Sequence, residues 1–348
     1  MSVYFFVWFA VALIAVLGRN KKTIGGKDGD TVFFLFLVLF LLSALRYDVG
    51  VDYLSYMRIY YSDNPDRSEP GFNFLNVLFR NKGFSFQSIV ILYGFVTIFF
   101  AFAYFKENSK NIYLSVLIFY CFTPLYLNSF NQLRQATAMY VFLWATRYIK
   151  QRKLLKFVLI TAVTAFFAHF SVVVLLPLYF FDKRISFKLG VFLFVAALIG
   201  YRFLDIVIEM LGYGFYIRYA MVFQKTGKRF PPVYFVELCF DILILLFYRA
   251  KGEKHFVEKN MVFAHFVLLF LLIMDPLSIV REALGRVLYY FLPVQIVLLP
   301  NMFVELKKLR LLGNYFCMAC FSMYLFLSVS IRGQSTNIVP YQTFFGKF

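Results

Sequence analysis

The chain has 348 residues, of which 61% are apolar and only 16% are charged. A soluble domain is about 45–50% apolar and about 25% charged, so this composition excludes an ordinary soluble protein. Phenylalanine alone accounts for 49 residues, which helices facing lipid can display but a soluble core could not bury. The composition therefore predicts an integral membrane protein with many spans.

The charge is strongly positive, with 36 Lys and Arg against 18 Asp and Glu, a net charge of +18. In a soluble protein this excess would suggest nucleic acid. Here most basic residues fall in short gaps between apolar runs, a pattern that encodes orientation in a membrane. We therefore expect no nucleic-acid partner. The four cysteines lie within apolar runs and predict no disulfide framework: Cys121, Cys239, Cys317 and Cys320.

The apolar runs predict an all-α polytopic membrane protein with 11 or 12 transmembrane helices, because a span needs about 17–25 residues. The expected spans are 2–17, 31–45, 87–105, 112–127, 133–148, 155–181, 187–205, 233–248, 261–274, 287–304 and 315–330. No internal repeat or flexible linker divides the sequence. We expect a single membrane domain over 1–348.

The run 155–181 decides the topology, because it is long for one span and short for two. It is either one tilted helix or two short helices that meet near His169. Two helices are favoured, since all predicted inner loops are then short and basic. This arrangement has 12 membrane segments and both termini outside. It places the two longest polar segments, 46–86 and 205–232, outside the cytoplasm.

The first long polar segment alternates charged residues with tyrosines. It reads Arg46-Tyr47-Asp48-Val49-Gly50-Val51-Asp52-Tyr53-Leu54-Ser55-Tyr56, followed by Glu69-Pro70-Gly71-Phe72. Aromatic rings stack on the C–H faces of sugars, whereas carboxylates and guanidinium groups bind hydroxyls and phosphates. The alternative is a belt of interfacial tyrosines with incidental charges.

Two further polar positions interrupt apolar sequence. Arg134 begins the run 133–148, where a charged residue tends to face the bundle or a water-filled cavity. Its guanidinium suits a phosphate, and the alternative is that it extends to the membrane surface. Burying His169 in an apolar run costs free energy unless the side chain is hydrogen-bonded or has a functional role. It is a candidate general base or phosphate donor, or else a satisfied buried histidine.

Further arginines fall on the same predicted outer side: Arg218, Arg281 and Arg286. Several cations on one face, together with Arg46 and Arg134, suggest a polyanionic ligand such as a lipid diphosphate. The sequence contains no Walker A loop, dinucleotide fingerprint, HExxH or GxSxG motif. We expect no cofactor and no metal.

These motifs resemble the EpsG family, Wzy-type polymerases of bacterial exopolysaccharide, capsule and O-antigen. The resemblance begins with Arg46-Tyr47-x-x-Gly50-x-Asp52-Tyr53-x-x-Tyr56 and Glu69-Pro70-Gly71-Phe72. It continues through Asn131-x-x-Arg134-Gln135, His169-Phe170-Ser171, Arg286 before an aromatic pair, and Pro340-Tyr341.

The resemblance implies a metal-independent glycosyltransferase in the bacterial cytoplasmic membrane, with its active site facing the periplasm or cell exterior. The growing glycan would move from undecaprenyl diphosphate to the non-reducing end of a new lipid-linked repeat unit. The implied partners are lipid-linked oligosaccharides, membrane lipid, a chain-length regulator and a flippase. An O-antigen ligase-type transferase and a transporter or flippase for the same lipid are the alternative functions.

The resemblance and the chemistry together assign expected roles. The candidate catalytic residues are Asp52, Glu69 and His169. The expected diphosphate ligands are Arg134, Arg286, Arg46 and Arg218, and the expected sugar-binding residues are Tyr47, Tyr53, Tyr56 and Gln135.

Overall fold

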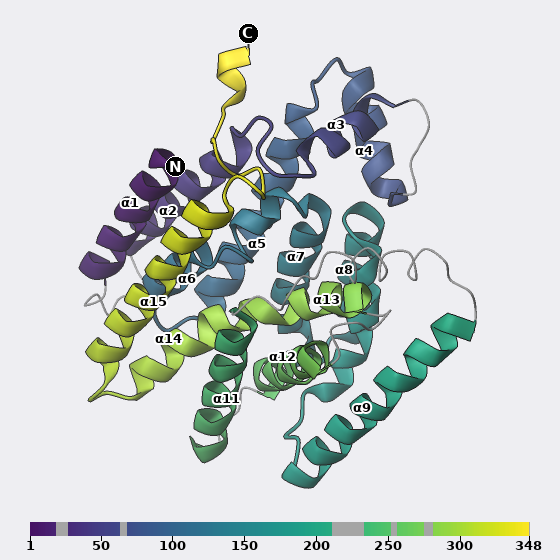
Figure 1. Ribbon diagram of the computed structural model, residues 1–348, viewed down its shortest axis with the longest axis vertical. Coiled ribbons are helices and arrows are strands. Elements are labelled where there is room, and N and C mark those ends of the chain that lie inside the picture. The colour runs from purple at the N-terminus through teal and green to yellow at the C-terminus, as the bar shows by residue number, and fades with distance from the viewer. Residues whose placement is uncertain (19–26, 63–67, 211–232, 252–255, 275–280, 348) are drawn as a thin grey trace. The chain divides into compact units, whose positions relative to one another are not determined.

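The computed structural model describes the chain except for residues 19–26, 63–67, 211–232, 252–255, 275–280 and 348. Helices joined by loops make up the described residues (Figure 1). They form two compact units, one of Met1–Leu176 with Ile296–Phe348 and one of Pro177–Gln295. The expectation of a single membrane domain stays a prediction.

The first unit is built around α7, which is buried along most of its length. Hydroxyls of Thr97 and Thr137 meet at 2.7 Å where α5 packs on α7. The helices of this unit are α1 (Ser2–Gly18), α2 (Lys27–Ala44), α3 (Tyr53–Tyr61), α4 (Pro70–Asn81), α5 (Gln87–Asn108), α6 (Ile112–Cys121), η1 (Leu127–Phe130), α7 (Leu133–Lys150), α8 (Leu154–Phe167), α15 (Arg310–Arg332) and η4 (Phe344–Lys347). Two further helices, η2 (Phe170–Phe181) and α14 (Gln295–Glu305), lie across the boundary of the units.

The second unit encloses a polar cluster within apolar helices. His265 Nδ1 lies 2.6 Å from Asp241 Oδ2, and Gln295 Nε2 donates to Asp241 Oδ1 at 2.7 Å. All three side chains are buried, so this histidine has a carboxylate partner that its sequence neighbours do not reveal. The helices of this unit are α9 (Phe187–Met210), α11 (Val233–Lys251), α12 (Phe256–Met274), α13 (Arg281–Phe291) and η3 (Leu292–Val294).

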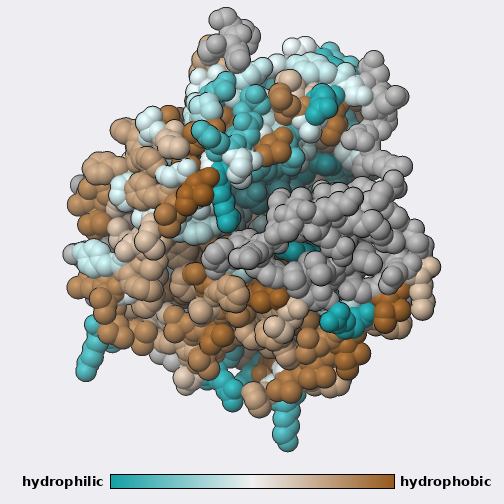
Figure 2. Space-filling view, in the orientation of Figure 1, coloured by the Kyte–Doolittle hydropathy of each residue, from teal (hydrophilic) through white to brown (hydrophobic). Residues whose placement is uncertain are grey.

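Five helical segments of the described chain are long and apolar enough to cross a membrane: Gln87–Asn108, Phe187–Leu204, Phe256–Met274, Ala283–Glu305 and Arg310–Arg332. Shorter apolar helices accompany them, among them α1, α6 and α8. Large hydrophobic side chains are exposed on α1, α2 and α15, whereas the part formed by α3 and α4 is more polar (Figure 2). The chain is an all-α multi-pass membrane protein, as the composition predicts.

The helices follow the predicted apolar runs, except that α6 is shorter than expected, the run 155–181 is divided, and the 3-10 helix η3 interrupts the run 287–304. Helix α6 ends at Cys121, short of the predicted 127, because Phe122 leaves the helical conformation shortly before Pro124. The run 155–181 is divided, since α8 ends at Phe167 and η2 begins at Phe170. The run is therefore not one continuous helix, because two short helices meet near His169, and their crossing of the membrane as two separate segments stays a prediction. The side of the membrane on which each loop lies stays a prediction.

The C-terminal residues bind the start of the polar segment 46–86. Tyr47 N–H donates to the Gln342 carbonyl at 2.9 Å, and Gly50 N–H donates to the Asn337 carbonyl at 2.7 Å. An isolated antiparallel bridge joins Arg46 to Thr343. The segment then folds into α3 and α4. Most of the other predicted long segment, 205–232, lies outside the described residues.

Candidate functional site

The motif Glu69-Pro70-Gly71-Phe72 starts α4 and holds it against the end of α8. Pro70 occupies the first helical position, where its missing N–H costs nothing. A Cβ at Gly71 would lie 2.6 Å from the Phe166 carbonyl oxygen and 2.7 Å from Phe167 Cδ1. Only glycine permits this approach without a shift. The motif therefore places Glu69 beside the chain break that follows α8.

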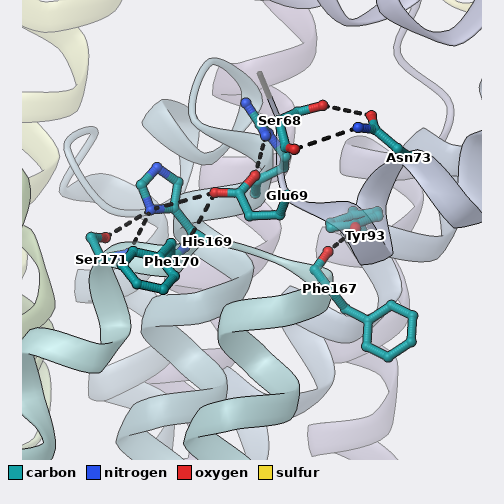
Figure 3. A network of polar contacts seen from close by, with 9 residues as sticks. Ser68, Glu69, Asn73, Tyr93, Phe167, His169, Phe170 and Ser171 are labelled. Atoms are coloured by element: carbon teal, nitrogen blue, oxygen red, sulfur yellow. Dashed lines mark hydrogen bonds and ion pairs between the residues drawn. The ribbon is translucent and has the colours of Figure 1, made fainter. Parts of the chain in front are cut away.

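The carboxylate of Glu69 connects α7 to that break, and Figure 3 shows Glu69 beside His169 and Phe170. It does not cap α4. Its Oε2 accepts a hydrogen bond from Arg134 Nη1, and its Oε1 accepts from the Phe170 N–H at 3.2 Å. His169 Nδ1 lies 4.0 Å from Oε1. The Glu69 and Arg134 side chains are 11% and 18% exposed, so the pair is largely but not completely withdrawn from solvent.

His169 is oriented by the residue two positions after it. The Ser171 N–H donates to His169 Nδ1 at 3.2 Å, and the Ser171 hydroxyl lies 2.7 Å from the same nitrogen. Because Nδ1 accepts the amide hydrogen, we assign the proton of the neutral ring to Nε2. Nε2 of the imidazole is then a hydrogen-bond donor. This favours His169 as a partner for a phosphate or hydroxyl oxygen rather than as a base.

Arg134 has aromatic neighbours and spare donor capacity. Its Cζ lies 4.9 Å from the Phe72 ring centroid and 5.6 Å from that of Tyr56. The buried Nε–H has no hydrogen-bond partner among the described residues. The residue stands in the first turn of α7, where the helix dipole disfavours a cation, and the charge of Glu69 compensates. A bound anion would also compensate the charge of Arg134 at this helix end.

Tyr56 is the predicted sugar-binding tyrosine that contacts Arg134. Burial raises the pKa of its phenol, and the nearby Arg134 opposes this shift. The phenol is therefore neutral at physiological pH and can both donate and accept. Asp52, immediately before α3, is half-buried and raises the pKa of Tyr56 by its negative charge. Its carboxylate thus lies in the electrostatic surroundings of the Arg134 site.

The other predicted sugar-binding residues are more enclosed. Tyr53 is 2% exposed and its hydroxyl donates to Gln87 Oε1 at 2.9 Å, as a structural tyrosine does. The Tyr47 ring packs on Tyr53 with centroids 5.6 Å apart. Gln135 is buried in α7. A role in sugar binding for these three residues stays a prediction.

Arg46 is 1% exposed and its guanidinium caps the end of α2 rather than facing an open site. Nη1 donates to the Ser43 carbonyl at 2.6 Å and to the Ser43 hydroxyl at 3.0 Å, and Cζ lies 4.6 Å from the Phe130 ring centroid. Basic side chains commonly satisfy the last carbonyls of a helix in this way. Burial lowers the pKa of Arg46 to about 10, so it is still charged at neutral pH.

The remaining predicted diphosphate ligands lie elsewhere in the chain. Arg286 is exposed in α13 of the second unit, and Arg281 begins the same helix. Arg218 lies outside the described residues. The expected convergence of these arginines with Arg134 on one ligand stays a prediction.

One connection between the motifs was missed by sequence reasoning. Gly50 has a φ of +103°, and a Cβ there would lie 2.8 Å from the Phe130 carbonyl oxygen. The next amide, Val51 N–H, donates to Asn131 Oδ1 at 2.6 Å. Asn131 thus fastens the first motif to the turn before α7. The sequence offered one signal for this role, since Asn131 lies only three residues before Arg134. In the same way, Ser171 lies two residues after His169, which it orients.

The family model of the EpsG family matches residues 31–343 of the chain. No curated protein and no solved structure shows significant similarity to this chain.

Proposed function

The chain belongs to the EpsG family, and from this we propose that it is a membrane polymerase of lipid-linked oligosaccharides in bacterial polysaccharide synthesis. It would transfer the growing glycan from undecaprenyl diphosphate to the non-reducing end of a new lipid-linked repeat unit. The observation that carries the assignment of the site is the Glu69–Arg134 pair held against the His169–Phe170 backbone.

We propose that Arg134 binds the diphosphate of the donor lipid. Its planar guanidinium offers several donors in a fixed geometry that matches phosphate oxygens. The buried Nε–H without a described partner supports this role. Negative charge grows on the diphosphate as the glycan leaves, and a preorganised cation stabilises that charge. No metal is needed for this step, so we expect chelators to leave the rate unchanged.

Glu69 is the proposed general base. A diphosphate at Arg134 competes with the Glu69 carboxylate for the same guanidinium. Binding of the donor would therefore free Oε2 to accept a proton. The acceptor oxygen then attacks the anomeric carbon, its proton passes to Glu69, and the bond from that carbon to the diphosphate breaks. The electron pair leaves with undecaprenyl diphosphate.

His169 and Tyr56 are proposed to orient the reacting groups. With its proton on Nε2, His169 can donate to a phosphate or to a sugar hydroxyl. Tyr56 presents a ring beside Arg134, where a sugar can stack. Asp52 would act indirectly through its charge near Tyr56. Of the three candidate catalytic residues, Asp52, Glu69 and His169, we therefore propose Glu69 as the general base.

Reconstituted polymerisation tests the proposal. The purified full-length protein in proteoliposomes receives one lipid-linked repeat unit as both donor and acceptor, and products are separated by length. A polymerase yields a ladder of lipid-linked products. A ligase requires a different acceptor, and a flippase moves the lipid without extending it. Absence of dimer and longer products from correctly folded, monodisperse protein would refute the proposed function.

A further inference from the structure

A cavity of about 710 Å³ lies within the second unit, between α9, α11 and α12. Three cations line it: Arg184 just before α9, Arg249 near the end of α11, and Lys259 in the first turn of α12. Arg184 and Lys259 thus lie on the N-terminal sides of α9 and α12, and Arg249 lies close to the C-terminal end of α11. No carboxylate is among the described residues that line the cavity.

Lys259 lies close enough to the other two cations to be repelled by both. Arg184 and Arg249 both act electrostatically on Lys259. Like charges held near one another destabilise the site that contains them. An anion bound between them would remove this cost. The site therefore has the charge of an anion-binding site.

The rest of the cavity is apolar and extends along the helices. Phe194, Phe263 and Phe266 line it, each one or more helical turns from the nearest cation. With a rise of about 1.5 Å per residue, the positions of Lys259 and Phe266 are roughly 10 Å apart along α12. The ligand should therefore carry its charge at one end and a hydrocarbon chain at the other.

The cationic end is held in place by hydrogen bonds. Asn260 Nδ2 donates to the Phe181 carbonyl and to the Lys183 carbonyl, the latter at 2.9 Å. These bonds anchor the backbone that carries Arg184. Arg249 lies over Phe187, with Cζ 5.0 Å from the ring centroid. The site is thus supported by residues that do not themselves need to bind the ligand.

We infer that this cavity binds the phosphate headgroup of an anionic membrane lipid. Arg184, Arg249 and Lys259 contact the headgroup, and the hydrocarbon chain lies along the phenylalanines. Its volume is in the usual range of ligand sites, and basic pockets between membrane helices bind anionic headgroups. The basic loops 182–188 and 249–259 are predicted to be cytoplasmic, so the lipid belongs to the inner leaflet. None of the residues that line this cavity belongs to the proposed polymerase site.

Lipid titration of the full-length protein in detergent tests the inference. Native mass spectrometry counts bound phosphatidylglycerol, undecaprenyl phosphate and phosphatidylcholine in separate arms. We expect at least one of the two anionic lipids to bind more tightly than phosphatidylcholine, and the tighter one identifies the source of the phosphate. Arg249→Gln and Lys259→Gln should each weaken anionic lipid binding about tenfold, as loss of a charge-assisted contact does.

Two control variants keep the result interpretable. Lys188→Gln removes a nearby cation that does not line the cavity, and it should bind lipid as the wild type does. Arg249→Lys keeps the charge and should retain most of the binding even if Arg249→Gln folds poorly. Equal binding of phosphatidylcholine, or an equal loss in Lys188→Gln, would overturn the inference.

Discussion

Replacing Glu69 by Gln removes a negative charge from the candidate site and keeps the shape of the side chain. The amide oxygen can still accept a hydrogen bond from Arg134 or from the Phe170 N–H. It cannot accept a proton from a sugar hydroxyl. A positioned general base contributes about 10²–10⁴-fold to a rate. We therefore expect the polymerisation rate of Glu69→Gln to fall by about this factor.

The same substitution costs some stability, because Arg134 loses its charged partner. The paired side chains are 11% and 18% exposed. Exposed pairs contribute about 0.2–1 kcal/mol, and breaking a fully buried pair costs about 3–5 kcal/mol. A value of about 1–2 kcal/mol follows for this intermediate burial. Proteins are stable by about 5–15 kcal/mol, so the variant should remain folded.

The assay is the initial rate of dimer formation in proteoliposomes, compared at equal amounts of monodisperse protein. Glu107→Gln is the matched control, because Glu107 pairs with Arg147 at 2.6 Å and both side chains are 36% exposed. It should retain the wild-type rate. If Glu69 and Arg134 act as one unit, the double variant Glu69→Gln/Arg134→Gln should lose little more than the worse single variant. A wild-type rate for Glu69→Gln would refute the proposed base.

Four further predictions concern the same unit. Arg134→Ala should abolish long polymer in cells while single repeat units still reach the surface; normal chain lengths from a stably expressed variant would contradict its role. His169→Ala should slow polymerisation about 10- to 100-fold, as loss of a charge-assisted donor does, and His169→Gln should restore part of the rate by supplying an N–H donor. Gly71→Ala should lower the free energy of unfolding by roughly 1–3 kcal/mol, the cost of overpacking, and the thermal midpoint should fall with it; an unchanged midpoint would contradict the close approach to α8. In a cysteine-free background, Ser62→Cys and Lys308→Cys should be labelled from opposite sides of the membrane; labelling of both from one side would exclude the 12-segment topology.

The helices could be predicted because hydrophobic length is a local property of the sequence. The break near His169 was also visible, since a polar residue near the middle of an overlong apolar run favours two short helices. The structure places the break at that histidine, between α8 and η2. The helices of the polar segment 46–86 were harder to predict, because short helices such as α3 and α4 do not contain a long apolar run.

The pairing of Glu69 with Arg134 could not be derived from sequence. The two residues are 65 positions apart, and Asp52 was an equally plausible partner. The pairing depends on the packing of α4 against α8, which Gly71 permits. Both residues could be proposed for the site from their sequence motifs, but their contact could not be.

For Arg46, the neighbouring residues in the sequence suggested a role that differs from the contacts of its side chain. Its neighbours in sequence, Tyr47 and Asp48, suggested an open ligand site. The guanidinium instead turns back three residues to Ser43 and closes the end of α2. The signal was its position just after a helix, where a basic side chain can bind the last carbonyls. Spacing alone does not distinguish this use from phosphate binding.

The contacts between the C-terminal residues and the segment 45–50 have a consequence for the order in which the protein assembles. Asn337 binds the carbonyl of Asp48 across 289 positions of the chain. Translation therefore supplies this partner only after nearly all preceding helices have left the ribosome. Until then, Tyr47 and Gly50 lack these backbone partners, and the turn that leads into α3 depends on contacts such as that between Val51 and Asn131. A nascent chain could insert its first helices early and still be inactive until synthesis passes residue 337.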